Sequence, residues 1–311
     1  MLVGRLASVH RYPVKSMAGE LLDSAELGAN GLLGDRAFAV RDDQAGEVRG
    51  GKKLPRLMLC SARYDEEPSA ARVPAAHISL PDGTETSTDD PAVSARVSAW
   101  LGRPATLCPL RPASDKEHYR RVQPGSQVAG WLARSAPLRK VVSRLATVGP
   151  SGAELRRDFG READEPLPDL SVFPAEIFEY VSPLGTYFDA FPIHLLTTGT
   201  LATMRAKQPA GDWDARRFRP NFVIESLAEQ GETPELGWAG KLLRIGEVVL
   251  ECTVATPRCS MVAQPQPGLR KDPSVLRSIV RDADQLLGLY ARVKHGGRVA
   301  SGAAVELIDE A

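Results

Sequence analysis

Cys259 is the residue of this sequence whose neighbours best suit chemistry at a side chain. It directly follows Arg258 and comes soon after a β-rich segment, residues 247–254, so we expect it on a loop beside a fixed positive charge. A nearby guanidinium favours the thiolate, which is the nucleophilic form of cysteine and a ligand for soft metals. The alternative is a small apolar residue of the core. The other three cysteines, Cys60, Cys108 and Cys252, have apolar, strand-like surroundings, which favour this core role for them. Spacing alone leaves both interpretations of Cys259 open.

Three short segments place basic and polar side chains beside predicted strands. They are residues 12–16, residues 34–36 and residues 216–221, the last with three arginines in four positions. Arginine is a planar, permanently charged fork that can bind a phosphate or carboxylate with two hydrogen bonds. Each segment is therefore a candidate anion site. The competing interpretation, a solvated charged surface, is equally compatible with the spacing.

Motifs for several other kinds of chemistry are missing from the sequence. No Gly-rich phosphate loop follows a predicted strand, no Cys-x-x-Cys pair occurs, and the 5 histidines lack metal-ligand spacing to each other or to cysteine. We therefore expect no seat for a dinucleotide, a zinc ion or an iron–sulfur cluster. The 4 cysteines are also too few for a disulfide framework.

The composition is that of an ordinary globular protein of about two domains. The 311 residues carry 39 basic and 39 acidic side chains, a formal net charge of 0, and 43% of them are hydrophobic. The zero net charge argues against nucleic acid and anionic membranes as partners. Proteins that bind them gain most of their affinity when basic side chains neutralise phosphate groups. The sequence has neither a run of about 18 apolar residues nor a secretory signal. We expect a cytoplasmic protein with no membrane partner and no nucleic acid partner.

Short strands at close spacing predict a β-barrel-like domain over residues 1–110. The expected strands are residues 3–11, 21–27, 36–42, 47–49, 57–64 and 77–80. Asp90 and Pro91 mark the start of a helix over residues 92–101, and Gly102 ends it.

Residues 111–184 are predicted to be a linker or insertion, and residues 185–311 a second domain. In the insertion, residues 131–145 have a weak amphipathic pattern that Pro137 interrupts. The second domain combines helices over residues 198–207 and 273–281 with several strands. These strands are residues 191–196, 219–226, 241–245, 247–254, 286–293 and 305–308. The predicted fold is α+β and mostly β, with two β-barrel-like domains and a partly helical insertion.

Several of these segments, in the same order, resemble a known family. Residues 12–16, 31–36 and 55–57 resemble the N-terminal β-barrel domain that precedes a MOSC domain, which is named after the C-terminal domain of molybdenum cofactor sulfurases. Residues 191–201, 217–221, 238–240 and 258–259 resemble the MOSC domain itself. The branch with the greatest similarity comprises the mitochondrial amidoxime-reducing component and its bacterial relatives.

The resemblance implies a site for the molybdenum cofactor (Mo-molybdopterin), a pterin dithiolene that ends in a phosphate. Cys259 matches the cysteine that binds molybdenum directly, and would be both the metal ligand and the catalytic residue. The other matches to cofactor-binding positions are Lys15, Ser16, Arg36, Thr197, Thr200, Arg219 and Asn221. Cations, hydroxyls and amides suit the phosphate, while a thiolate suits the soft metal.

The resemblance also implies a function, a molybdenum-cofactor-binding oxidoreductase that reduces N-hydroxylated or N-oxide small molecules by oxygen-atom abstraction. Electrons would come from a separate flavin or iron–sulfur protein, because the sequence has no motif that would bind a dinucleotide or an iron–sulfur cluster. After Cys259 the chain reads Ser-Met-Val where the reductase branch has a threonine-rich stretch, which leaves the substrate open. Two alternatives also stay open. One is a carrier of the cofactor, or of sulfur as a Cys259 persulfide, and the other is a cofactor-free binding module.

Overall fold

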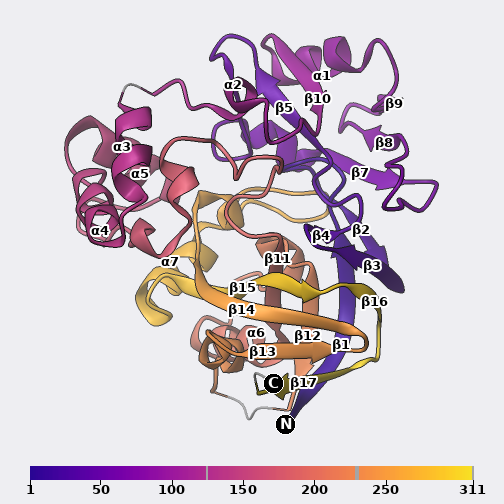
Figure 1. The fold of residues 1–311 in the computed structure, drawn as a ribbon, viewed down its shortest axis with the longest axis vertical. Coiled ribbons are helices and arrows are strands. Elements are labelled where there is room, and N and C mark those ends of the chain that lie inside the picture. Colours follow the sequence, from indigo (N-terminus) through magenta and orange to yellow (C-terminus); the bar gives the residue numbers. More distant parts are fainter. Residues whose placement is uncertain (124, 228–230, 310–311) are drawn as a thin grey trace.

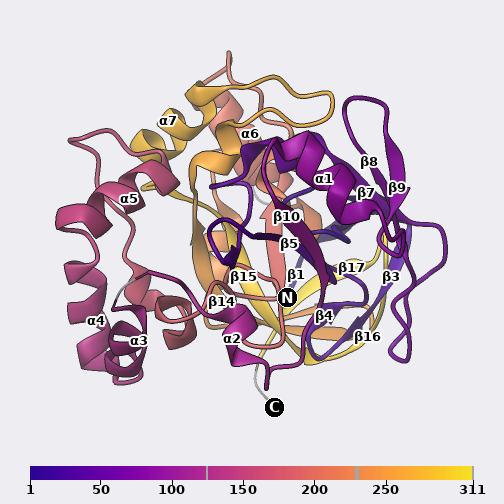
Figure 2. The same cartoon turned by 90° about the horizontal axis from the view of Figure 1, so that it is seen from above.

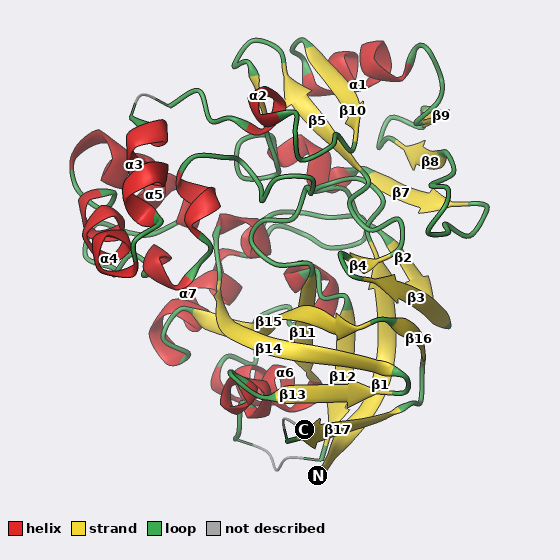
Figure 3. Ribbon diagram, viewed as in Figure 1, coloured by secondary structure: helices red, strands yellow, loops and turns green. Residues whose placement is uncertain are grey.

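The computed structural model describes residues 1–123, 125–227 and 231–309. A β-barrel forms one end of the molecule, small sheets and a helix form the other, and a group of helices lies along one side (Figures 1 and 2). The predicted α+β fold with β-barrel domains and a partly helical insertion is confirmed. Helices make up 29% of the chain and strands 30%, so helix is more abundant than the sequence pattern indicates (Figure 3). No helix in the described part of the chain is long and apolar enough to cross a membrane.

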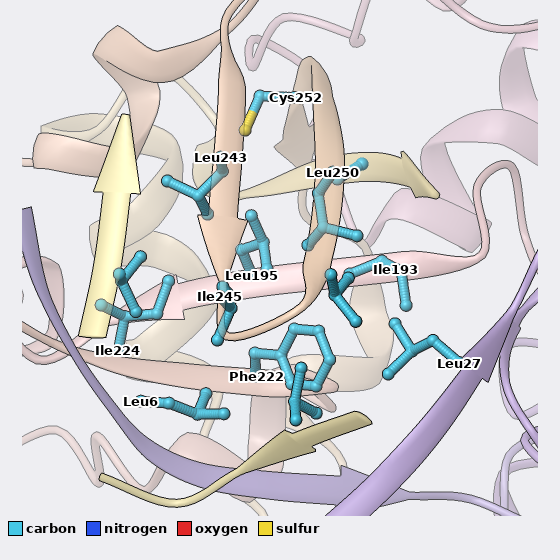
Figure 4. Close-up of a cluster of buried hydrophobic side chains, with 14 of the residues drawn as sticks. Leu6, Leu27, Ile193, Leu195, Phe222, Ile224, Leu243, Ile245, Leu250 and Cys252 are labelled. Atoms are coloured by element: carbon cyan, nitrogen blue, oxygen red, sulfur yellow. The ribbon is translucent and has the colours of Figure 1, made fainter. Parts of the chain in front are cut away.

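Seven strands close the barrel in the order β12-β11-β15-β14-β13-β17-β1, with β1 pairing back to β12. They are β1 (Leu2–Arg11), β11 (Ile193–Thr197), β12 (Phe222–Ser226), β13 (Leu242–Ile245), β14 (Val248–Pro257), β15 (Leu286–His295) and β17 (Ala304–Ile308). Strands β11 and β12 are parallel and are connected through helix α6 (Thr198–Lys207). Alternating apolar side chains, among them Leu195, Phe222 and Leu243, point inward and fill the barrel (Figure 4).

The barrel is built from both ends of the chain. Strand β1 pairs with β12 on one side and with β17 on the other, and both partners come from the C-terminal part. In return, β16 (Gly297–Ala300) pairs with β3 (Ser24–Gly28). Strand pairing therefore crosses the division that the sequence predicts at residues 110 and 184, and that division stays a prediction.

Small sheets surround a second core near the N-terminus. One contains β7 (Ser61–Tyr64), β8 (Ala76–Ser79) and β9 (Glu85–Ser87), and another contains β5 (Phe38–Asp42), β6 (Glu47–Val48) and β10 (Ala105–Pro109). Strand β4 (Gly31–Leu32) joins β3, and β2 (Glu20–Leu22) joins β1. Helix α1 (Val93–Leu101) ends at Gly102 with a φ of 71°, as predicted.

The predicted strand over residues 57–64 is wrong in its first half. Pro55–Leu59 is a 3-10 helix, and only Ser61–Tyr64 is a strand. Pro55 lies in the first turn, where its fixed φ suits a helix and its missing N–H is not needed. The predicted strand 219–226 likewise begins late, at Phe222, because the left-handed backbone of Arg219 and the ring of Pro220 interrupt it.

The insertion forms more helices than the sequence predicts. It holds α2 (Lys116–Tyr119), α3 (Ser126–Ala133), α4 (Ala136–Leu145) and α5 (Gly149–Phe159), then 3-10 turns at Leu170–Val172 and Ala175–Phe178. The one interrupted helix predicted over residues 131–145 is in fact two helices. Pro137 lies in the first turn of α4, where a missing N–H costs nothing, so it starts a helix instead of breaking one. A last helix, α7 (Pro273–Asp282), shares an apolar cluster with α6.

Candidate functional site

A cavity of about 750 Å³ lies where the N-terminal segment, the barrel and the insertion meet. Five of the eight residues predicted from the sequence line it. They are Lys15, Ser16, Arg36, Arg219 and Cys259. These side chains come from distant parts of the sequence, so only the fold brings them together.

One end of the barrel positions these residues. Strand β1 ends beside the start of β12, so the residues after β1 face those before β12. The hydroxyl of Tyr12 accordingly donates a hydrogen bond to the carbonyl of Pro220 at 3.0 Å. Cys259 follows β14, and the preceding residue Arg258 donates a hydrogen bond to the carbonyl of Phe218, just before β12, at 2.9 Å. The loops that carry the basic residues and the loop that carries the cysteine therefore converge.

Three residues of the cavity have a left-handed backbone that side chains disfavour. Ser16, Arg36 and Arg219 have φ values of 71°, 49° and 53°. Each such residue costs of order 1–3 kcal/mol, and strain of this kind concentrates at functional sites. Tertiary contacts hold the geometry: the amide of Gly51 donates to Ser16 Oγ at 2.8 Å, and the amide of Arg36 donates to the Tyr12 carbonyl at 2.7 Å.

Three buried arginines that line the cavity, Arg217, Arg219 and Arg258, each have one N–H group without a described hydrogen-bond partner. Arg219 donates through Nη1 to the Met17 carbonyl at 2.6 Å, and Arg258 donates through Nη2 to the Phe218 carbonyl at 2.9 Å. Within the described residues, Arg219 Nη2 and Arg258 Nε have no hydrogen-bond partner although both are buried. Burial lowers the pKa of Arg219 to about 10, so it is still a cation at neutral pH. A buried cation with an unused donor is a ready partner for an anion.

The ring of Tyr12 connects the basic residues of the two domains. The guanidinium carbons of Arg36 and Arg219 lie 5.0 and 4.2 Å from its centre, within the range of a cation–π interaction. Arg36 also forms an ion pair with Asp35. Burial alone would lower the pKa of Arg36, but the Asp35 carboxylate, together with Tyr12 and Asp189, outweighs it and raises that pKa. Both arginines are therefore charged and held in place.

Lys15 reaches the cavity from the N-terminal side. Its Nζ donates to Asp189 Oδ1 and to the Tyr187 carbonyl, both at 2.7 Å. Burial lowers the pKa of Lys15, and the charge of Asp189 partly offsets this. For Asp189 burial acts in the opposite direction, but the ammonium groups of Lys15 and Lys52 outweigh it and lower the pKa of the carboxyl. The result is a paired lysine with further basic groups around it.

Cys259 differs from the other cysteines in its exposure. It is partly exposed in the cavity, whereas the other three are buried, as predicted. Its loop is held by the end of the insertion: Arg161 donates to the Arg258 carbonyl at 2.8 Å, and Ser260 donates to the Asp158 carbonyl at 2.8 Å. The insertion therefore positions the loop that presents the thiol.

Thr197 and Thr200 do not line the cavity among the described residues. Thr197 is the N-cap of α6 and accepts the Thr200 amide at 3.1 Å, which confirms the predicted hydroxyl near the helix start. Both hydroxyls donate to Glu235 Oε2, at 2.6 and 2.5 Å. Their role as cofactor contacts stays a prediction, while their observed role is to hold a buried carboxyl.

We expect Glu235→Gln to gain stability relative to the natural protein as pH rises above about 4.5, the ordinary pKa of the glutamate side chain. Burial raises the pKa of Glu235 in the folded state, against the opposing effect of the threonine hydroxyls. The folded protein then binds the proton more tightly than the unfolded chain, so its stability falls with rising pH until the folded pKa is passed. The limit is about 1.4 kcal/mol per pH unit. Urea unfolding at several pH values would measure this.

The exposed residue Glu225 offers the matched control for that measurement. Its change to glutamine controls for the general effect of removing one carboxylate from the chain. A Glu235→Gln variant whose stability follows the same pH curve as the natural protein would show that Glu235 has no raised pKa.

Asn221 is also not among the described residues that line the cavity, but it is connected to a lining residue through hydrogen bonds. Its Oδ1 accepts the His194 amide at 3.1 Å, and its Nδ2 donates to Asp35 Oδ2 at 3.1 Å. Asp35 in turn pairs with Arg36. Asn221 thus orients a cavity residue through Asp35, and its direct contact with a cofactor stays a prediction.

Several cavity residues were not among those predicted. Asp189, His194 and Tyr290 line the cavity, and no sequence motif marks them. Burial, together with the charge of Arg258, lowers the pKa of His194 well below its usual range, so its ring is neutral at pH 7. Lys52 also lines the cavity, and the basic run over residues 49–53 is a signal that could have found it.

Comparison with known proteins identifies both halves of this arrangement. Residues 3–101 match the MOSC N-terminal beta barrel domain, and residues 185–306 match the MOSC domain. The chain is 24% identical to mitochondrial amidoxime reducing component 2 of Bos taurus over 96% of its own length and 82% of that protein.

Solved structures with some similarity are more distant. The YuaD protein from Bacillus subtilis has a TM-score of 0.41 and 10% identity, over 99% of this chain and 97% of that one. YiiM from Geobacillus stearothermophilus has a TM-score of 0.30 and 18% identity, and the match spans 38% of this chain and 55% of YiiM. The chain therefore carries a match to the MOSC N-terminal beta barrel domain followed by a match to the MOSC domain.

Proposed function

We propose that this protein is a molybdenum-cofactor-binding oxidoreductase that reduces N-hydroxylated or N-oxide compounds with electrons from a separate protein. The observation that carries the proposal is one cavity in which basic residues of both domains, three of them with unpaired buried N–H groups, meet a partly exposed cysteine. The similarity to a protein named for amidoxime reduction supports the reaction class.

The residues present suit the anionic part of such a cofactor. Arg219 Nη2 and Arg258 Nε are buried donors without a described partner, and donors of this kind gain most from a charge-assisted hydrogen bond to an anion. Gly50 lets the loop before Lys52 pack closely against Ser16, because a Cβ at that position would lie 2.8 Å from Ser16 Oγ. We therefore assign Lys15, Ser16, Arg36 and Arg219 to holding the cofactor.

Cys259 is the residue that would bind the metal. In the described part of the chain, no three His, Cys, Asp or Glu side chains are grouped to hold a metal ion. A metal at Cys259 must therefore bring ligands of its own, as a pterin dithiolene does. A thiolate is the ligand that a soft metal prefers, and the contacts of Arg161 and Ser260 fix the loop that carries it.

The protein residues would bind and orient the cofactor and the substrate. The bound cofactor would supply the two-electron chemistry that breaks the N–O bond. The overall reaction converts R–NHOH, two electrons and two protons into R–NH₂ and water. Residues 111–184 contribute side chains that line one side of the cavity.

The electron source can be tested with purified protein made in a host that supplies molybdenum cofactor. We expect no substrate reduction with NADH or NADPH alone, because the sequence has no dinucleotide-binding motif. With reduced viologen, a one-electron donor, we expect reduction of hydroxylamine-type substrates. Turnover with NADH alone in a flavin-free preparation would contradict the need for a separate partner.

Metal analysis of the same preparation separates the possible functions. About one molybdenum per chain together with viologen-driven turnover supports the proposal. Sulfane sulfur on Cys259 without molybdenum would indicate the sulfur carrier instead. Neither molybdenum nor sulfane sulfur would indicate a binding module that keeps only the fold.

A further inference from the structure

We propose that the helical insertion builds an apolar chamber that receives the hydrocarbon tail of the substrate, so that this protein prefers amphiphilic N-hydroxylated compounds. The inference rests on the proposed function, because it takes the reacting head of the substrate to lie near Cys259. It assigns a role to residues 111–184, which lie outside both family matches.

The cavity has two ends of different chemistry. The N-terminal segment and the barrel line one end with Lys15, Arg36, Arg219 and Cys259. The insertion lines the other end with apolar side chains from α3, α4 and the turns after α5. They include Val128, Leu132, Val142, Leu145, Phe173 and Phe178, and we call this end the apolar chamber.

Several polar groups near the chamber already have hydrogen-bond partners. Lys53 Nζ donates to Glu154 Oε1 at 2.7 Å and lies 2.8 Å from Asp158 Oδ1. Ser126 donates to the Arg121 carbonyl at 3.3 Å. The insertion also brings Arg121 to the cavity, where its Nε donates to the Ile177 carbonyl at 3.0 Å. A ligand tail in the chamber would meet mainly hydrocarbon, with this guanidinium beside it. This favours an aliphatic or aromatic tail over a sugar, a nucleotide or a peptide backbone.

The chamber is open to solvent, which distinguishes it from a packed core. Val128 and Leu145 at its mouth are each 62% exposed. Protein interiors are close-packed, so an open apolar space of this kind marks a ligand site more than a structural element. Because the chamber and Cys259 share one cavity, a single molecule can occupy the chamber with its tail and reach the thiol with its head.

Two measurements on the full-length protein test the inference. The first is calorimetric binding of primary n-alkyl amides from butanamide to decanamide, which resemble amidoximes but have no N–O bond to reduce. Each methylene that enters the chamber should raise the affinity about fourfold until the chamber is full. The second is viologen-driven reduction of n-alkyl amidoximes of the same lengths, for which KM should fall in parallel.

The two helices offer matched variants. Leu145→Asp and Val128→Asp place a charge in the chamber and should weaken decanamide binding by about tenfold or more. The bound alkyl tail would cover the new carboxylate, and removing an unpaired carboxylate from water costs free energy. Val141→Asp on α4 and Trp131→Asp on α3 are the controls. Val141 and Trp131 are 50% and 64% exposed and are not among the described residues that line the cavity. These controls should bind decanamide as the natural protein does.

The outcomes separate this inference from the proposed function. Amide affinity that does not change with chain length, or equal losses in lining and control variants, would overturn the chamber. Chain-length-dependent binding without amidoxime reduction would keep the chamber and reject the reductase. Reduction of amidoximes with a KM indifferent to chain length would keep the reductase and reject the chamber.

Discussion

Replacing Cys259 by serine is expected to reduce bound molybdenum to near zero and to abolish substrate reduction while the protein stays folded. Serine preserves the volume of cysteine, but its hydroxyl is a harder and far less acidic ligand. Because Cys259 is partly exposed, the free energy of unfolding should change by no more than about 1 kcal/mol. Molybdenum content by mass spectrometry and urea unfolding of the same samples would measure both effects.

The buried cysteines provide the controls for that experiment. Cys252 lies in the barrel core and Cys60 in the core near the N-terminus, and burial raises the pKa of each thiol to about 12. Serine at either position should lower stability and leave the molybdenum content per folded chain unchanged. If Cys252→Ser removes the metal and Cys259→Ser does not, the assignment of the ligand is wrong.

Removing one cation of the cavity should weaken cofactor retention by roughly ten- to a hundredfold. Arg219→Ala and Lys15→Ala each delete a charge-assisted hydrogen bond, worth about 1.5–3 kcal/mol when one partner is ionised. Arg219→Lys keeps the charge but loses the planar fork, so we expect an intermediate loss. Molybdenum content of protein expressed under limiting cofactor supply would show the order natural, Arg219→Lys, Arg219→Ala.

Arg216 is the matched control for Arg219. It belongs to the same basic segment, but its side chain is 53% exposed, binds Asp214, and is not among the described residues that line the cavity. Arg216→Ala should retain the cofactor fully. Unchanged occupancy in Arg219→Ala and Lys15→Ala, or an equal loss in Arg216→Ala, would contradict a specific anion site.

Features that depend on nearby residues could be predicted well from the sequence. The helix at residues 93–101 ends at Gly102 because glycine adopts the left-handed conformation there, and Thr197 caps α6 with its own hydroxyl. The position of Cys259 on a loop after a strand was also predictable, because the β-rich segment before it is short and well marked. In each case the interacting groups are within a few residues of each other.

The sequence pattern gave a wrong prediction where a proline could either break a helix or begin one. The sequence pattern predicts that Pro137 interrupts a helix, but Pro137 instead stands in the first turn of α4. The same residue type serves both purposes, since a proline lacks an N–H and has a fixed φ in either case. Packing of α3 and α4 against the turn Ala175–Phe178 decides which occurs, and that contact is invisible in a short window of sequence.

The sequence by itself determined the order of most elements, the family resemblance and the candidate ligand Cys259. The tertiary structure alone decided which candidates share a site. Arg219 bonds to Met17 and Tyr12 bonds to Pro220, contacts between residues about 200 positions apart. These contacts exist because β1 pairs with β12 and thereby joins the first residues of the chain to the second domain. Such pairing depends on the complementarity of whole strands, so no pattern within either segment predicts it.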